Sequence, residues 1–111
     1  MAVYVKVLIP AKVAENSQTT QYTSQNVTTI IDKFTATNFG AATATLSVNI
    51  VTGGDTPGNA NLITKTRTLQ PNEAYTFPEL VGQVIAASGY ISTLASAANT
   101  INIRSSGREV S

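Results

Sequence analysis

Hydrophobic and polar residues alternate along much of the chain with the two-residue period of β-strands. The clearest case is residues 43–51, where apolar side chains at the even positions alternate with Thr, Ser and Asn. Such alternation is typical of a strand with one buried face and one face in water. The pattern predicts a half-buried strand here, with Leu46 and Val48 in the core and Thr45 and Ser47 outside.

Other stretches rich in β-branched and aromatic residues predict further strands, with Gly, Pro and Asn marking the turns between them. We expect these strands over residues 3–9, 19–24, 27–38, 62–69, 74–77, 90–96 and 100–105, with 106–111 extending the last. Residues 79–85 fit either one helical turn or a short strand. Residues 52–61 are rich in Gly, Pro and Asn and predict an exposed loop, and residues 70–73, with Pro in the second position, predict a type I turn.

Eight or nine short strands, with turn signals about every 8 to 12 residues, are typical of an antiparallel sandwich. The chain has 111 residues, which suits one domain with a modest core. The fold class expected is therefore all-β, a single antiparallel β-sandwich or jelly roll covering residues 1–111.

Asp32 is out of place in the alternation of residues 27–38. A regular strand would put it on the same face as Ile30 and Phe34, where an unpaired carboxylate is costly if the face is buried. We expect a bulge that changes the register here. The alternative is that Asp32 pairs with a cation such as Lys65, Arg67 or Arg104.

The N-terminal strand combines strong β-propensity with one charge, Lys6. Pro10 is expected to end it because proline lacks the N–H that a ladder needs, and residues 11–18 are expected to follow as a polar connection. Left unpaired, such a strand is an aggregation hazard. Because Lys6 interrupts the short apolar run, we expect neither a signal peptide nor a membrane anchor.

Residues 1–18 are therefore a candidate N-terminal arm that pairs with a neighbouring subunit or with another protein to which the chain binds. The residues expected at this protein interface are Val3, Tyr4, Val5, Val7 and Ile9, with the valines and Ile9 on one face. An edge strand of the chain's own sandwich is the alternative, since terminal strands commonly dock on their own domain.

Composition narrows the chemistry. Charged residues make up 12% of the chain and the net charge is +1, so no charged field favours nucleic acid or a membrane surface as a partner. The chain has no His and no Cys, which excludes disulfides, the usual zinc sites and histidine-based catalysis. The serines have no histidine to activate them. We expect no enzyme, no catalytic residue and no cofactor.

A calcium site is the one metal option that the sequence offers. Asp55, Asn59 and Asn61 lie in the predicted loop and carry side-chain oxygens. A single carboxylate is too few for an ion that normally takes several charged oxygen ligands. We therefore expect a solvated loop without a metal.

The chain from residue 38 onward resembles a family of small all-β virion proteins of tailed bacteriophages. The segments that carry the resemblance are Thr-Asn-Phe-Gly at 37–40, Leu-Gln-Pro-Asn-Glu-Ala-Tyr at 69–75, Glu-Leu-Val-Gly-Gln-Val-Ile at 79–85, Gly-Tyr-Ile-Ser at 89–92, Ala-Ser-Ala at 95–97 and residues 101–109. Gly89 is followed by Tyr90 where the family pattern has Asp, so a polar contact is replaced by an apolar one or lost.

The resemblance implies a capsid decoration or cement protein that binds the major capsid protein and stabilises the head shell. It implies a symmetric oligomer, with a homotrimer expected, on the capsid surface of a virion after synthesis in the host cytoplasm. A tail, connector or fibre component is the alternative. From another class, a carbohydrate-binding jelly roll needs aromatic rings beside carboxylates or amides, and Tyr75 near Glu73 is the one such pairing in the sequence.

Overall fold

The structure, a computed structural model, describes residues 2–111, which form nine strands and one short 3-10 helix. Every stretch for which the sequence predicts a strand contains one, and residues 79–85 form a turn followed by a two-residue strand. The elements are β1 (Val3–Val13), β2 (Thr19–Thr23), β3 (Thr28–Asn38), β4 (Ala44–Val51), η1 (Asn59–Asn61), β5 (Leu62–Leu69), β6 (Ala74–Thr76), β7 (Val84–Ile85), β8 (Tyr90–Ala95) and β9 (Ile101–Val110).

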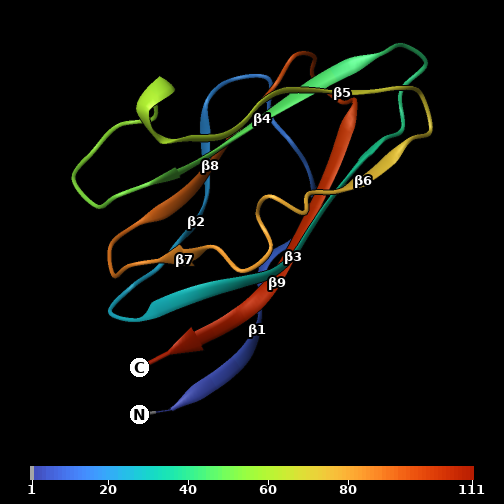
Figure 1. The fold of residues 1–111 in the computed structure, drawn as a ribbon. Helices are drawn as coiled ribbons and strands as arrows, with labels where there is room; N and C mark the ends of the chain where they lie inside the picture. The colour runs from blue at the N-terminus through green and yellow to red at the C-terminus, as the bar shows by residue number, and fades with distance from the viewer. Residues whose placement is uncertain (1) are drawn as a thin grey trace.

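Two antiparallel sheets pack face to face (Figure 1). One has the order β1-β9-β3-β6, with β7 also paired with β3, and the other has the order β2-β8-β4-β5. The pairing is nested, because the first strand pairs with the last, β2 with β8, β3 with β6 and β4 with β5. This nesting is the wrapping of a jelly roll. The all-β sandwich that the sequence predicts is confirmed.

Inward-facing residues of both sheets form the core. Leu46 and Val48 of β4 have no exposed surface, as the alternation predicts. From the other sheet Phe34 meets Phe77 edge to face, with ring centroids 5.2 Å apart. Such edge-to-face pairs add to the free energy gained from burying the rings. The two sheets are therefore held together by the inward-facing side chains of both.

Ser47 departs from the prediction that it lies outside. It is only 8% exposed, and its Oγ accepts a hydrogen bond of 2.8 Å from the backbone N–H of Thr66. Thr66 has a positive φ of 48° and lies where the β4–β5 register shifts. Ser47 thus satisfies a backbone donor that this irregularity withdraws from the ladder.

A bulge in β3 accounts for Asp32. The register with β9 shifts between Ile31 and Lys33, so Ile31 and Phe34 are both buried while Asp32 is exposed. The register change that the sequence predicts is confirmed. Asp32 also has a cationic partner, but this partner is Arg108 and none of the three cations considered from the sequence.

Two predictions for β1 are wrong. The strand does not end at Pro10 but continues to Val13, so residues 11–13 belong to a strand and not to a polar connection. β1 lies at the edge of its sheet, and its register with β9 shifts between Ile9 and Lys12. Sheet edges and bulges are the places where a strand tolerates a missing N–H.

The turn at residues 70–73 differs from its prediction. Asn72 has a φ of 65°, which belongs to the third position of a type II turn and not to the predicted type I turn. Residues 52–61 form an exposed loop, as predicted, which also contains η1. The Asn61 side chain holds this loop together by accepting from Gly58 N–H at 3.0 Å and donating to the Thr56 carbonyl at 2.9 Å.

Gly107 lies where backbones crowd. A Cβ placed on it would be 2.2 Å from the Ile30 carbonyl oxygen and 2.9 Å from a Leu8 methyl carbon. The β1 and β3 register shifts both lie beside this stretch of β9. Only glycine fits this approach of three strands, and the strand continues through Gly107 without a break.

Replacing Leu46 or Val48 with Asp is expected to unfold the protein. An isolated carboxylate in the core faces a desolvation cost of several kcal/mol, comparable with the roughly 5 to 15 kcal/mol that stabilises a domain. Thr45→Asp, at a partly exposed position of the same strand, is expected to cost about 0.5 kcal/mol. Thermal melts measure all three variants. Equal tolerance of Leu46→Asp and Thr45→Asp would contradict the inward phase of β4.

Gly107→Ala is expected to lower the free energy of unfolding by roughly 1 to 3 kcal/mol, because the added methyl overlaps the Ile30 carbonyl. Gly58→Ala is the matched control, since nothing lies within 4 Å of its Cβ position and its φ of −170° is ordinary extended backbone. Urea denaturation compares the two. If the two variants lost the same stability, the close approach at Gly107 would not be a constraint.

Candidate functional site

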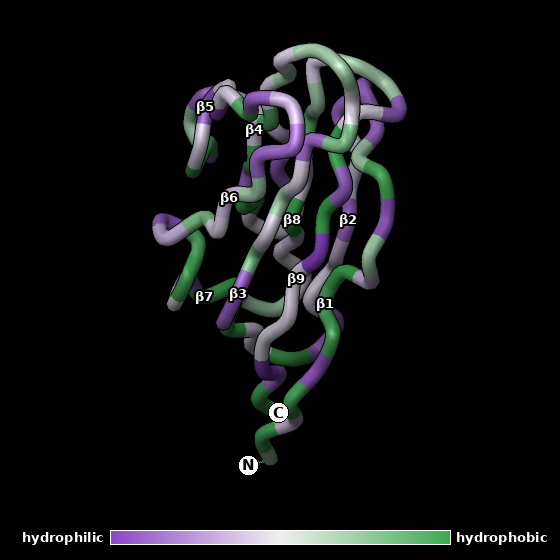
Figure 2. The backbone as a smooth tube through the Cα atoms, turned by 90° about the vertical axis from the view of Figure 1, so that its right-hand side faces the viewer, coloured by the Kyte–Doolittle hydropathy of each residue, from purple (hydrophilic) through white to green (hydrophobic). Residues whose placement is uncertain are grey.

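The ends of β1 and β9 extend beyond the body of the sandwich, at the pole where both termini lie, and the start of β3 pairs beside them (Figure 2). We call this the terminal extension, consisting of residues 3–7 of β1, 107–110 of β9 and 28–31 of β3, which pair in that order. The molecule is correspondingly long, with extents of 46 × 26 × 20 Å. A large share of the exposed apolar side chains lies here.

The terminal extension contains four of the five residues predicted to form an interface. Val3, Tyr4, Val5 and Val7 are 56%, 58%, 87% and 42% exposed. Ile9 is fully buried, because the register shift after Val7 places both Leu8 and Ile9 in the core. In the structure Ile9 is therefore a core residue, and the bulge separates it from the valine face.

The predicted arm, residues 1–18, is docked on its own sheet in this structure. β1 pairs with β9 from Val3 to Val13, which is the edge-strand alternative. Residue 1 lies outside the described residues. Pairing of the same strand with another subunit stays a prediction.

The outer face of the terminal extension is mostly apolar, with Thr28 and one ion pair as its polar groups. Val3, Val5 and Val7 of β1 share this face with Arg108, Val110 and Ile30, as the register shows. The guanidinium of Arg108 binds both carboxylate oxygens of Asp32, with Nη2–Oδ1 at 2.9 Å and Nε–Oδ2 at 3.0 Å. Both side chains are about 40% exposed, so the pair adds little to stability but neutralises the charges on this face.

The inner face of the terminal extension is held by a polar cluster. The Tyr22 hydroxyl of β2 donates a short hydrogen bond to Glu109, and Glu109 also binds Lys6 at 3.3 Å. Thr29 Oγ1 is 2.7 Å from the Tyr22 hydroxyl and 2.8 Å from Ser24 Oγ. Burial, and then the hydrogen bond to Glu109, raise the pKa of Tyr22 to about 12. The cluster joins the two sheets at the base of the extension.

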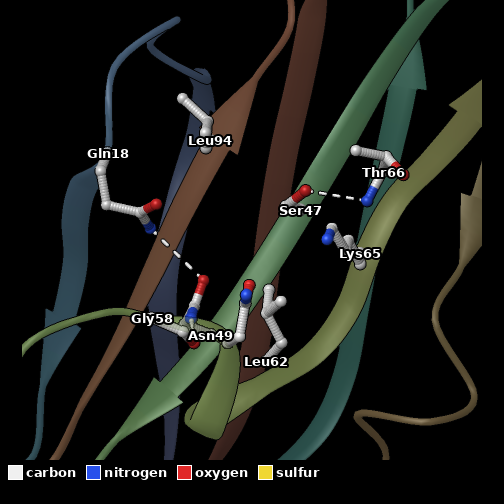
Figure 3. A pocket seen from close by; sticks show the side chains of 9 residues that line it. Gln18, Ser47, Asn49, Gly58, Leu62, Lys65, Thr66 and Leu94 are labelled. Atoms are coloured by element: carbon white, nitrogen blue, oxygen red, sulfur yellow. Dashed lines mark hydrogen bonds between the residues drawn. The ribbon is translucent and has the colours of Figure 1, made fainter.

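A groove of about 200 Å³ lies on the outer face of the second sheet (Figure 3). Ser47 and Asn49 of β4, Leu94 of β8, and Leu62 and Lys65 of β5 line it, together with Gln18, which directly precedes β2. Several of its polar atoms bind one another: Gln18 donates to Ser92 Oγ at 2.8 Å, and Asn49 donates to the Gly58 carbonyl at 3.0 Å and to Asn61 Oδ1 at 2.7 Å. These bonds attach the η1 loop to the sheet.

The carbohydrate-binding hypothesis requires the Tyr75 ring to lie beside the Glu73 carboxylate, but the two side chains have other partners. The Tyr75 ring lies 3.8 Å from the Arg67 guanidinium, and its hydroxyl donates to Glu79 at 3.1 Å. Burial raises the pKa of Glu79, but hydrogen bonds from Thr64 and Tyr75 outweigh it and the pKa is lowered overall. Glu73 instead caps its own turn through Gln70 N–H. The contacts among Arg67, Tyr75 and Glu79 thus connect β5 with β6 at the edge of the sandwich.

One of the three loop residues considered for calcium already uses its side-chain oxygen within the chain. Asn61 Oδ1 already accepts from Asn49 and Gly58. Among residues 2–111, no three acidic side chains gather in a way that could hold a metal ion. In the same part of the chain, no helix is both long and apolar enough to cross a bilayer.

Comparison of the chain with protein-family models, with curated proteins and with solved structures gave no match. The chain's own geometry is therefore the basis on which a function is inferred.

The free energy of unfolding is expected to fall at alkaline pH as the Tyr22 hydroxyl ionises and its hydrogen bonds are lost. Because the pKa of Tyr22 is raised from 10.0 to about 12, its contribution is complete below pH 10 and is lost as the pH rises towards 12. Tyr22→Phe is expected to cost roughly 1 to 3 kcal/mol at neutral pH and to lose this part of the alkaline dependence. Urea denaturation from neutral pH to pH 12 measures both, with Tyr90→Phe as a surface control. Identical alkaline slopes for wild type and Tyr22→Phe would contradict the assignment.

Proposed function

We propose that the protein is a structural component of a bacteriophage virion, a decoration protein that binds the head shell and copies of itself. The observation that carries the proposal is the exposed apolar terminal extension, where Val3 and Val5 are 56% and 87% exposed at one pole of an elongated sandwich. Exposed patches of this kind mark protein–protein interaction sites. The jelly-roll topology adds support by analogy, since viral capsid domains use it.

In this role the terminal extension makes the contacts and the rest of the sandwich is a rigid support. The outer face of the terminal extension presents valines around the Arg108–Asp32 ion pair, whose charges cancel. Such a face is better suited to contact with an apolar protein surface than with a charged one. The polar cluster of Tyr22, Glu109 and Thr29 keeps the extension from fraying. No step in this role needs a catalytic residue or a cofactor.

The tail, connector and fibre alternatives share this chemistry and differ in partner, so they are outcomes of the capsid-binding experiment. The homotrimer implied by the resemblance stays a prediction, which light scattering coupled to size exclusion measures. Carbohydrate binding has less support: the groove in the second sheet is not lined by any aromatic residue, and Tyr75 is held by Arg67 and Glu79. Strong glycan-array binding without capsid binding would favour it.

Replacing Val3 and Val5 with Ser is expected to weaken binding to undecorated capsids at least tenfold. Each valine that becomes buried contributes about 1.5 kcal/mol, and 1.4 kcal/mol corresponds to a factor of about ten. Co-sedimentation with capsids that lack their decoration protein measures the affinity. Phe39→Ser is the control, because Phe39 is 50% exposed and follows the opposite end of β3. Failure of the wild-type protein to co-sediment with any capsid would refute the proposed role.

A further inference from the structure

The outward edge of β1 has unpaired backbone groups at alternate residues. Ala2 and Ser111 exchange two backbone hydrogen bonds, at 3.2 and 2.9 Å. Bonded and non-bonded pairs alternate in an antiparallel ladder, so the next bonded pairs with β9 are those of Tyr4 and Lys6. The N–H and C=O groups of Val3, Val5 and Val7 therefore point away from β9. Within residues 2–111 no strand pairs with this side of β1.

The rest of the β1 edge is protected and this part is not. Beyond Val7 the strand carries two register shifts, Pro10 and Lys12, which are features that discourage pairing. From Val3 to Val7 the register with β9 is regular, and Lys6 is the one charge. The edge is thus open for pairing over five residues.

We infer that a second copy of this chain covers this edge, with the two β1 strands antiparallel about a two-fold axis at Val5. Val5 then lies opposite Val5 of the second copy, and Val3 opposite Val7 of the second copy. Each of these pairs joins residues whose backbone groups are free, so each exchanges two hydrogen bonds. The inference rests on the self-association in the proposed function and specifies its contact.

Two criteria favour an axis at Val5 over axes at nearby positions. One is the avoidance of like charges opposite each other, and the other is the matching of residues whose backbone groups are free. An axis at Lys6 would place the two lysines directly opposite each other, which is unfavourable. An axis at Tyr4 places fewer valines opposite valines. An axis between two adjacent residues places free backbone groups opposite groups that are already bonded to β9. With the axis at Val5, Lys6 lies opposite Tyr4 of the second copy and keeps its own partner, Glu109, at 3.3 Å.

The arrangement inferred from the free backbone groups also brings exposed valine side chains together. On the outer face, the valines of both copies form one continuous row, which covers side chains that are between 42% and 87% exposed in the single chain. The contact is isologous and therefore closes at two copies. It predicts a dimer as the unit of assembly, in contrast to the threefold assembly that the resemblance implies.

The test uses the full chain and Val5→Pro. Because the Val5 N–H points away from β9, proline there removes an edge donor without breaking the β1–β9 ladder. Wild type is expected to give a dimer mass in light scattering at micromolar concentration, and Val5→Pro a monomer with unchanged circular dichroism. Val5→Lys, which places two ammonium groups opposite each other, is the second variant if Val5→Pro does not fold. Val84→Lys, at a residue 57% exposed in β7, is the control and is expected to stay dimeric.

A cross-link tests the register directly. The chain has no cysteine, so Val5→Cys introduces a single thiol. Opposed residues in a bonded antiparallel pair have Cα atoms about 5.5 Å apart, within disulfide reach. Oxidation is expected to link Val5→Cys into dimers and to leave Val84→Cys unlinked. A wild-type monomer, a wild-type trimer, a dimeric Val5→Pro variant or an unlinked Val5→Cys variant would each overturn the inference.

The two proposals fail separately. A dimer that depends on Val5 but does not bind capsids refutes the virion role and leaves the contact intact. A monomeric protein that binds capsids refutes the contact and leaves the role intact.

Discussion

The close approach of the β3 backbone and the Leu8 side chain to Gly107 is the constraint on which the rest of the structure depends. With no Cβ on β9, the Ile30 carbonyl and the Leu8 side chain both come close to the central strand. The register shifts of β1 and β3 lie beside this point. They turn Leu8 and Ile9 inward and Asp32 outward, and they divide the sheet into a covered part and an extension. The absence of a Cβ at Gly107 thus allows the strand approach that lies at the boundary between the core and the terminal extension.

The extension is stable because its inner face is tied to the other sheet. Tyr22 reaches from β2 to Glu109 and Thr29, and Glu109 also holds Lys6. The outer face has no comparable tie, and its ion pair joins β3 and β9 of the same sheet. The two faces of the same strands therefore differ, because one is bound to the other sheet and the other is exposed.

The sequence predicts the strands well because each strand depends on local alternation, as in residues 43–51. It fails where the outcome depends on a partner distant in sequence. Pro10 is tolerated because β1 is an edge strand, and Ile9 is buried because of a bulge against β9. Glu109 lies 87 positions from Tyr22, and no local pattern marks either residue as part of a cluster. Asp32 was the informative exception, since a carboxylate among apolar neighbours is a local signal of a register change.

The nested pairing of strands also has a consequence for biosynthesis. The first strand pairs with the last, and Ala2 and Ser111 bond to each other. Such long-range pairing makes folding slow, because large loops close before their contacts form. On the ribosome, the hairpin of β4 and β5 is complete early, but β1 has no partner until β9 emerges. During that interval the valines of β1 lack their strand partner, and the sheet that contains β1 is completed only when β9 has been made.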